Sequence, residues 1–87
     1  MDAHLKAKWV EALRSGEYKQ ARLMLEDDGR FCCLGVLCKV AGLDTGDSGP
    51  TYRRLDKITG GYGQLVTLND DQMKSFKQIA RWIEVNL

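Results

Sequence analysis

Three cysteines have the most versatile chemistry in this sequence, because a thiolate can bind a metal or act as a nucleophile. Cys32 and Cys33 are adjacent and Cys38 follows five positions after Cys33. Zinc sites instead favour cysteine pairs about two to four residues apart, with a second pair or histidines elsewhere, and His4 is the only histidine. Free cysteine is among the most buried residue types. We therefore expect three small core residues, and we predict no metal site and no cofactor.

Catalytic chemistry has little support. A nucleophilic cysteine needs a histidine base or a cationic setting, and Cys32 or Cys33 at a helix start meets that condition only loosely. The neighbouring carboxylates Asp27–Asp28 and Asp70–Asp71 fall where turns are expected, and Asp is common in turns because its side chain bonds to the backbone. The sequence predicts no catalytic residue, so we expect a protein that is not an enzyme.

A basic, aromatic and glycine-rich segment carries the clearest signal for a ligand. Residues 51–60 have a net charge of +2 (three basic, one acidic), against −3 for residues 26–50 (two basic, five acidic). Arg forks, Lys ammonium groups and Gly-rich turns hold anions, and tyrosine rings stack on nucleobases. The alternative is structural, since cations late in a helix compensate its dipole and no Walker or dinucleotide fingerprint is present. The candidate ligand-binding residues are Tyr52, Arg53, Arg54, Lys57, Gly60, Gly61, Tyr62 and Gly63.

The end of the chain offers a second candidate surface. On a helix there, Trp82 lies about 120° off the core stripe and Val85 lies on its far side. Tryptophan is enriched at interface hot spots. The alternative is that Trp82 covers the edge of the core and Val85 is a scattered apolar surface residue. As an interface this face predicts a homo-oligomer, because homodimers are the commonest assemblies.

Helical periodicity predicts the elements that must position these residues. A first helix spans residues 3–15, since Leu5, Trp9, Ala12 and Leu13 recur on one face, and Gly16 ends it. A final helix starts near Ser75, which has capping-box spacing to Gln78. Its core face comprises Phe76, Ile79, Ala80, Ile83 and Leu87.

The middle helix, residues 33–41, is apolar almost all round, which is typical of the buried centre of a fold. Gly35 lowers its helix propensity by about 1 kcal/mol relative to Ala. We therefore expect another backbone, or a ligand, to approach closely at Gly35. Gly42 ends this helix.

The remaining segments are short. Residues 18–31 form two strands joined around Asp27-Asp28-Gly29, although residues 18–25 can also be written as a helix. After the loop 42–50, a helix opens at Pro50 with Ser48 or Gly49 as its cap and ends at Thr59-Gly60. Residues 64–68 (QLVTL) are β-prone and residues 69–71 a turn. The order α-β-β-α-α-β-α predicts one small α+β domain, 1–87, with about four helices packed on a minimal antiparallel sheet or hairpin.

Composition limits the class of protein. A net charge of +1 from 13 basic and 12 acidic residues argues against dedicated nucleic-acid binding. No apolar run approaches the ~20 residues that span a bilayer, and the first residues lack the apolar core of a secretion signal. With an odd number of cysteines, a reducing cytosol is the expected compartment.

Three stretches of the sequence are distinctive: residues 9–18 (WVEALRSGEY), residues 29–38 (GRFCCLGVLC) and the tail Leu68-Asn69-Asp70, Ser75-Phe76, Ile79-Ala80 and Ile83-Glu84. Together they resemble a family of small uncharacterised proteins of tailed bacteriophages and prophages. The resemblance covers most of the chain except residues 42–63. It implies a small accessory protein in the cytoplasm of an infected bacterium, a setting in which such proteins often counter host defence.

We therefore expect an anti-defence protein that acts by binding, and two hypotheses describe what it binds. In the first, it sequesters a small anionic, nucleotide-type immune signal without cleaving it: Arg53, Arg54 and Lys57 neutralise phosphates, the turn at residues 60–63 offers backbone donors, and Tyr52 or Tyr62 stacks on the base. In the alternative, it inhibits a host defence enzyme by binding it, as anti-CRISPR proteins do, with Trp82 and Val85 in the contact surface.

Overall fold

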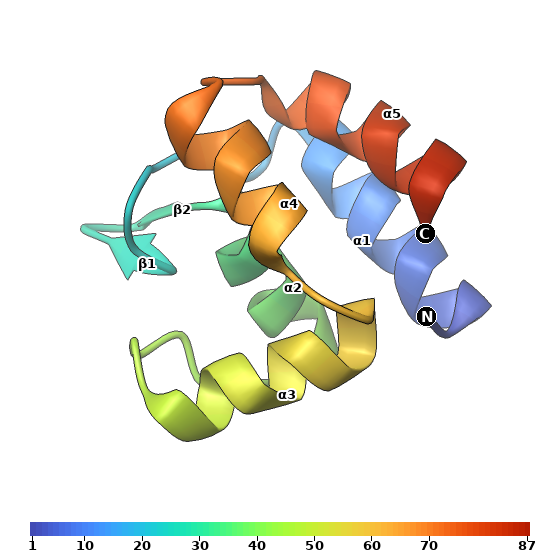
Figure 1. The fold of residues 1–87 in the computed structure, drawn as a ribbon. Helices are drawn as coiled ribbons and strands as arrows, with labels where there is room; N and C mark the ends of the chain where they lie inside the picture. Colours follow the sequence, from blue (N-terminus) through green and yellow to red (C-terminus); the bar gives the residue numbers. More distant parts are fainter.

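The computed structural model describes residues 1–87 and contains five α-helices, one π-helix and a two-stranded sheet (Figure 1). In chain order the elements are α1 (Ala3–Ser15), β1 (Glu26–Asp27), β2 (Arg30–Phe31), α2 (Cys33–Ala41), α3 (Gly49–Thr59), α4 (Gly63–Val66), the π-helix η1 (Thr67–Asp71) and α5 (Phe76–Asn86). The α+β class is confirmed, with five α-helices where about four were predicted. No helix has both the length and the apolar character needed to cross a membrane.

The helix boundaries follow the capping residues in the sequence. Asp2 caps α1 by accepting a hydrogen bond from the Leu5 backbone N–H, and Ser48 caps α3 in the same way. Ser75 and Gln78 form the predicted capping box at the start of α5. The predicted spans of α1 and α2 are both confirmed. Each helix is ended by a glycine in the left-handed conformation, as predicted.

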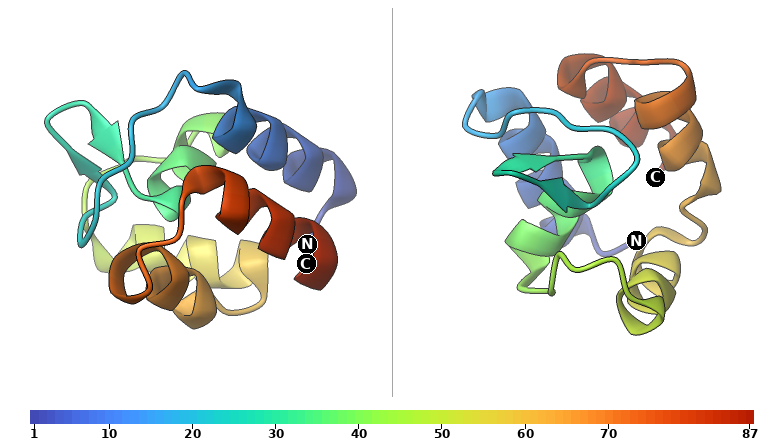
Figure 2. Two further views of the ribbon diagram at one scale, coloured as in Figure 1. Left: turned by 90° about the horizontal axis from the view of Figure 1, so that it is seen from above. Right: turned by 90° about the vertical axis from the view of Figure 1, so that its left-hand side faces the viewer.

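Helix α2 lies at the centre of the molecule, as its apolar circumference predicts. Residues 33–38 are all buried, and α1, α4 and β2 pack against the helix. Trp9 on α1 is fully buried, and its indole Nε1–H donates to the carbonyl oxygen of Cys33 at 2.9 Å. Helix α5 lies along α1, and both chain termini are at one end of the molecule (Figures 1 and 2).

Gly35 is required by the close approach of a second backbone segment, as predicted. A Cβ atom at this position would lie 1.9 Å from the carbonyl oxygen of Leu25. The fully buried Leu25 is the last residue before the hairpin. The segment that precedes β1 is therefore pressed directly against α2.

The hairpin is real but much shorter than predicted. Only Glu26 pairs with Phe31 and Asp27 with Arg30, around the Asp28-Gly29 turn. Residues 18–25 form neither a strand nor a helix, although Gln20 makes one isolated parallel bridge to Phe31. Figure 2 (right) shows this segment as a loop that extends across the hairpin toward the α4–η1 helix.

The third predicted strand is wrong. Residues 64–68 belong to α4 and η1, and residues 69–71, predicted as a turn, lie within η1. Leu65 and Leu68 are both buried at the i, i+3 spacing of a helical face, and the two-stranded sheet does not include the segment. Burial against α2 therefore overrides the β-propensity of Val66 and Thr67.

Candidate binding site

The structure brings together only part of the predicted ligand site. Tyr52 and Tyr62 are in contact, with ring centroids 5.4 Å apart and planes tilted by 50°. The cationic residues Arg53, Arg54 and Lys57 are exposed on α3, and none of them lines a cavity with the tyrosine pair. The cations and the rings therefore do not form one continuous site.

The glycine turn after α3 is mostly occupied with ending the helix. The N–H groups of Gly60 and Gly61 both donate to the carbonyl oxygen of Asp56, and Gly61 also donates to the Thr59 hydroxyl. Gly60 and Gly61 have φ angles of 78° and 125°, which explains why glycine is needed there. Two of the backbone donors predicted for an anion are thus already used.

A hollow of about 250 Å³ lies beside the tyrosine pair, where segments distant in sequence converge. Its apolar lining includes Cys32, Cys33 and Leu34 from the start of α2 and Val66 from α4. Tyr52 and Tyr62 form one wall, Asn69 and Asp70 from η1 another, and Leu23 and Met24 from the loop before β1 the edge. This volume is below the roughly 300–1,000 Å³ of sites for drug-sized ligands, so it suits one side chain or ring.

The edge of the hollow is made by two exposed apolar residues that the sequence analysis did not identify. Leu23 is 81% exposed and Met24 is 43% exposed. Leu23 also has a φ of 73°, in the left-handed region that costs a non-glycine residue about 1–2 kcal/mol. A large apolar side chain that is both strained and exposed is a candidate for contact with a partner.

Asn69 positions the walls of the hollow. It is 1% exposed, and its amide uses its full hydrogen-bonding capacity. Its Oδ1 accepts from Gln20 Nε2 at 2.9 Å and from the Cys33 backbone N–H at 3.2 Å. Its Nδ2 donates to the Ala21 carbonyl oxygen at 2.9 Å and to Asp70 Oδ1 at 2.7 Å. One side chain therefore joins the 20–24 loop, α2 and η1.

One carboxylate, Asp70, lines the hollow, and a second, Asp47, is bonded to the lining residue Tyr52. Asp70 Oδ1 accepts the Leu23 backbone N–H at 3.1 Å, which holds the strained loop in place. Asp47 Oδ1 accepts the Tyr52 hydroxyl at 2.6 Å and the Leu25 backbone N–H at 3.3 Å. Burial raises the pKa of Tyr52 well above its ordinary value, and the hydrogen bond to Asp47 raises this pKa further. The Tyr52 hydroxyl therefore stays protonated, as a donor to Asp47.

The three cysteines are buried and unpaired, as predicted. Cys32 is the cap of α2, and its sulfur accepts the Gly35 backbone N–H at 3.4 Å. Burial raises the pKa of all three thiols, to about 11 for Cys38. The thiols are thus held in the neutral form, which is a poor nucleophile. Nowhere do three His, Cys, Asp or Glu side chains meet at a spacing that could hold a metal ion.

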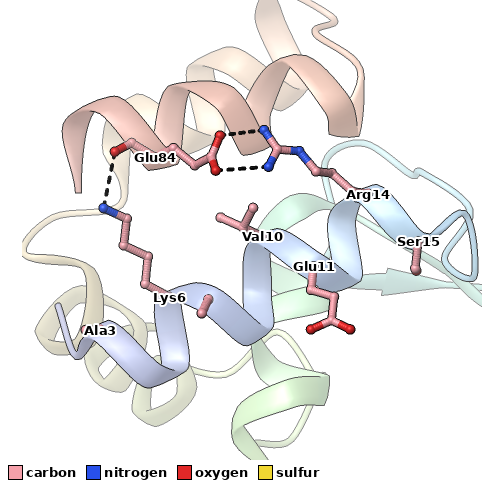
Figure 3. Close-up of a pocket in the computed structure, with 8 residues that line it drawn as sticks. Ala3, Lys6, Val10, Glu11, Arg14, Ser15 and Glu84 are labelled. Atoms are coloured by element: carbon pink, nitrogen blue, oxygen red, sulfur yellow. Dashed lines mark hydrogen bonds and ion pairs between the residues drawn. The ribbon is translucent and has the colours of Figure 1, made fainter.

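A larger, shallow depression of about 810 Å³ runs along α1 and α5 (Figure 3). Three of its four charged residues bond to one another: Arg14 forms a two-bonded ion pair with Glu84, and Lys6 Nζ donates to the Glu84 carbonyl oxygen at 3.3 Å, whereas Glu11 points away from them. This pairing lowers the pKa of Glu84 and raises that of Arg14. The groups fasten α5 to α1 at the surface, so this depression is a weaker candidate for a ligand site.

The second predicted surface is a groove of about 350 Å³ on α5. Trp82 is half-buried against the core and Val85 is 66% exposed, and both line the groove. Trp82 therefore covers the edge of the core, as one of the two alternatives states, and it also lines the groove. Lys74 and Arg81 also line it.

No curated protein and no solved structure matches this chain. A family model, described as a domain of unknown function (DUF8296), matches residues 1–54, from the N-terminus through α2 and into α3. This range includes Leu23, Met24 and residues 32–34 of the hollow. The chain therefore belongs to the DUF8296 family.

Proposed function

We propose that this protein acts by binding another protein and that the hollow beside Leu23 is the docking site. The observation that carries the proposal is the strained and exposed Leu23, with Met24, at the edge of a preformed apolar hollow. Interface hot spots are typically apolar anchors in pockets that exclude water. The edge residues would contact the partner while one of its side chains enters the hollow.

The biological setting comes from the sequence resemblance. The segments that resemble tailed-phage proteins support a phage-encoded accessory protein in the cytoplasm of the infected host. There it would block a host defence protein without a catalytic step of its own. The neutral, buried thiols are consistent with a role that requires no nucleophile.

The test compares two substitutions that are matched in backbone conformation. Leu23 and Met73 are both exposed, by 81% and 65%, and both have a positive φ, but only Leu23 borders the hollow. Affinity capture from a bacterial lysate should recover a partner with the wild type and with Met73→Asn, and lose it with Leu23→Asn. Equal recovery with Leu23→Asn would show that the hollow is not the docking site.

Self-association forms a further part of the proposal, through Trp82 and Val85. Val85 is 66% exposed beside the half-buried Trp82 in the groove on α5. Light scattering coupled to size-exclusion chromatography should give the mass of an oligomer for the wild type and of a monomer for Val85→Asp. A monomeric wild type would contradict this part. A host partner lost with Val85→Asp but not with Leu23→Asn would move the docking site to α5.

Sequestration of a nucleotide-type signal is the second candidate function. The contact between Tyr52 and Tyr62 favours it, because paired rings can hold a base, and Arg54 is exposed on the same helix as Tyr52. Protein purified from signalling or infected cells should then release a nucleotide on denaturation, detected by mass spectrometry, and Arg54→Glu should abolish binding. An empty protein whose melting temperature is unmoved by cyclic or ADP-ribose-type nucleotides would exclude this function.

A further inference from the structure

The charges around the hollow define the chemistry of its occupant. Asp70 lines the hollow and Asp47 is bonded to Tyr52 in its wall. In both residues, Oδ1 accepts hydrogen bonds from backbone or side-chain donors of the protein. In both, Oδ2 makes no hydrogen bond. Neither is in a salt bridge, since the one ion pair of the structure joins Arg14 and Glu84. Two carboxylate oxygens at this site thus lack a partner.

No cationic side chain lines the hollow. Burial raises the pKa of Cys32, whose side chain lies in the lining, and the negative charges of Asp70 and Asp47 raise it further. Asp70 lies in the lining itself, and Asp47 accepts the hydroxyl of the lining residue Tyr52 at 2.6 Å. An anionic group placed in the hollow would therefore be repelled by both carboxylates.

The amino end of α2 offers an incoming anion only part of the donors of a free helix start. Two of its N–H groups are already bonded, that of Cys33 to Asn69 Oδ1 and that of Gly35 to the Cys32 sulfur. A helix start binds anions through such free N–H groups. With these donors used internally, the hollow is apolar inside and negative at its border.

We infer that the hollow is a docking site for a protein segment in which a large apolar side chain is flanked by Lys or Arg. The apolar side chain enters between Leu23, Met24 and the tyrosine pair, and the flanking cations meet Asp47 and Asp70. Charge complementarity of this kind selects partners and raises the rate of association. The inference rests on the proposed role of the hollow and specifies the chemistry of its partner.

Three short peptides provide the probes, with the same central tryptophan and different flanks: Lys-Lys-Trp-Lys-Lys, Ser-Ser-Trp-Ser-Ser and Glu-Glu-Trp-Glu-Glu, all blocked at both ends. Titration into ¹⁵N-labelled protein, followed by two-dimensional NMR, should shift the amide signals of Leu23, Cys33 and Asn69. The lysine peptide should bind at least tenfold more tightly than the glutamate peptide, and added salt should reduce the difference.

Isosteric substitutions separate charge from structure. Asp47→Asn and Asp70→Asn keep the Oδ1 acceptor and remove the charge, so each should weaken the lysine peptide about threefold to tenfold and leave the serine peptide unchanged. Asp28→Asn is the matched control, because Asp28 is an exposed carboxylate of the hairpin turn outside the hollow. It should not change the affinity for any of the three peptides.

The outcomes distinguish this inference from the proposed function. Equal affinity of the three peptides, or tighter binding of the glutamate peptide, would overturn the selectivity and leave the docking role standing. Absence of shifts at Leu23, Cys33 and Asn69 with every peptide, while lysate capture still depends on Leu23, would also overturn it. Failure of both experiments would remove the hollow as a docking site altogether.

Discussion

Gly35 is a residue whose identity is determined by a single contact. A Cβ atom there would lie 1.9 Å from the Leu25 carbonyl oxygen and 2.8 Å from its carbon, so the backbone of one segment would have to move. Gly35→Ala should lower the free energy of unfolding by about 3 kcal/mol or more in urea denaturation, at the upper end of overpacking effects.

Gly46→Ala is the control for this prediction. A Cβ atom at Gly46 would make ordinary contacts at 3.5 Å or more, all with the side chain of Asp44, and its φ is not positive. Its stability should change by less than about 0.5 kcal/mol. If Gly35→Ala unfolds cooperatively within 1 kcal/mol of the wild type, the two segments do not pack as closely as the structure indicates.

Leu23 should reveal a conflict between stability and function. Its φ of 73° is unfavourable for leucine and tolerated by asparagine, and its side chain is 81% exposed, so little packing is lost on substitution. Leu23→Asn should therefore raise stability by about 0.5–1 kcal/mol, while it removes the proposed contact with the partner. A melting temperature several degrees higher is the expected result.

Met73→Asn should stabilise to a similar extent, because Met73 has a φ of 53° and is 65% exposed. A loss of stability in Leu23→Asn alone would show that Leu23 packs on its own protein. In that case its exposure would no longer support a docking role.

At the scale of elements, Asn69 joins η1 to α2 and to the loop before β1. Asn69→Ala would leave the Cys33 N–H and the Ala21 carbonyl oxygen without this partner, whereas Gln20 Nε2 keeps its bond to the Lys74 carbonyl oxygen. Because unsatisfied buried polar groups cost about 1–3 kcal/mol each, we expect the free energy of unfolding to fall by at least about 2 kcal/mol.

Hydrogen exchange can localise this effect. In Asn69→Ala the amides of residues 20–25 should exchange faster than those of α1, because the loop loses its attachment to η1. Asn86→Ala is the control, since the Asn86 side chain is exposed and bonds only to Trp82 in its own helix. Equal protection of the loop in wild type and Asn69→Ala would show that its other hydrogen bonds, to Asp70, Asp47 and Lys74, are enough to hold it.

The helices show what local signals can and cannot determine. Helices α1, α2, α3 and α5 were predictable because capping residues and terminal glycines define their ends. Helix α4 and η1 were not, since Val66 and Thr67 have β-propensity and only contact with α2 makes the segment helical. The same segment carries Asn69, so the element that was predicted wrongly also holds the hub of the site.

The candidate site was predictable only where the residue type is informative. Tyr52 and Tyr62 were identified and do meet, because α3 and the turn after it bring them together. Leu23 and Met24 were missed, because an irregular loop has no periodicity to indicate exposure. Arg53 and Arg54 were grouped with the tyrosines by sequence proximity, although both are exposed and neither lines the hollow.

At the scale of the whole molecule, the thiols make stability depend on pH. All three cysteines are buried in or beside the central helix, and burial raises their pKa values, for Cys38 from an ordinary 9.0 to about 11. An unfolded chain releases these protons near pH 9, whereas the folded chain retains them. The contribution of the protonated thiols to the free energy of unfolding is therefore fully present below about pH 9, and it is lost as the pH rises toward 11.

Thermal unfolding from pH 7 to pH 10.5 should therefore show a melting temperature that is steady at first and falls above about pH 9. The informative comparison is with Cys38→Ala. This variant should be less stable at pH 7 because it leaves a small cavity, yet its melting temperature should fall less steeply above pH 9, since one of the buried thiols no longer titrates. Parallel curves for the two proteins would show that Cys38 is accessible as a thiolate in the folded state, and rapid alkylation of the native protein by iodoacetamide at pH 8 should then accompany that result.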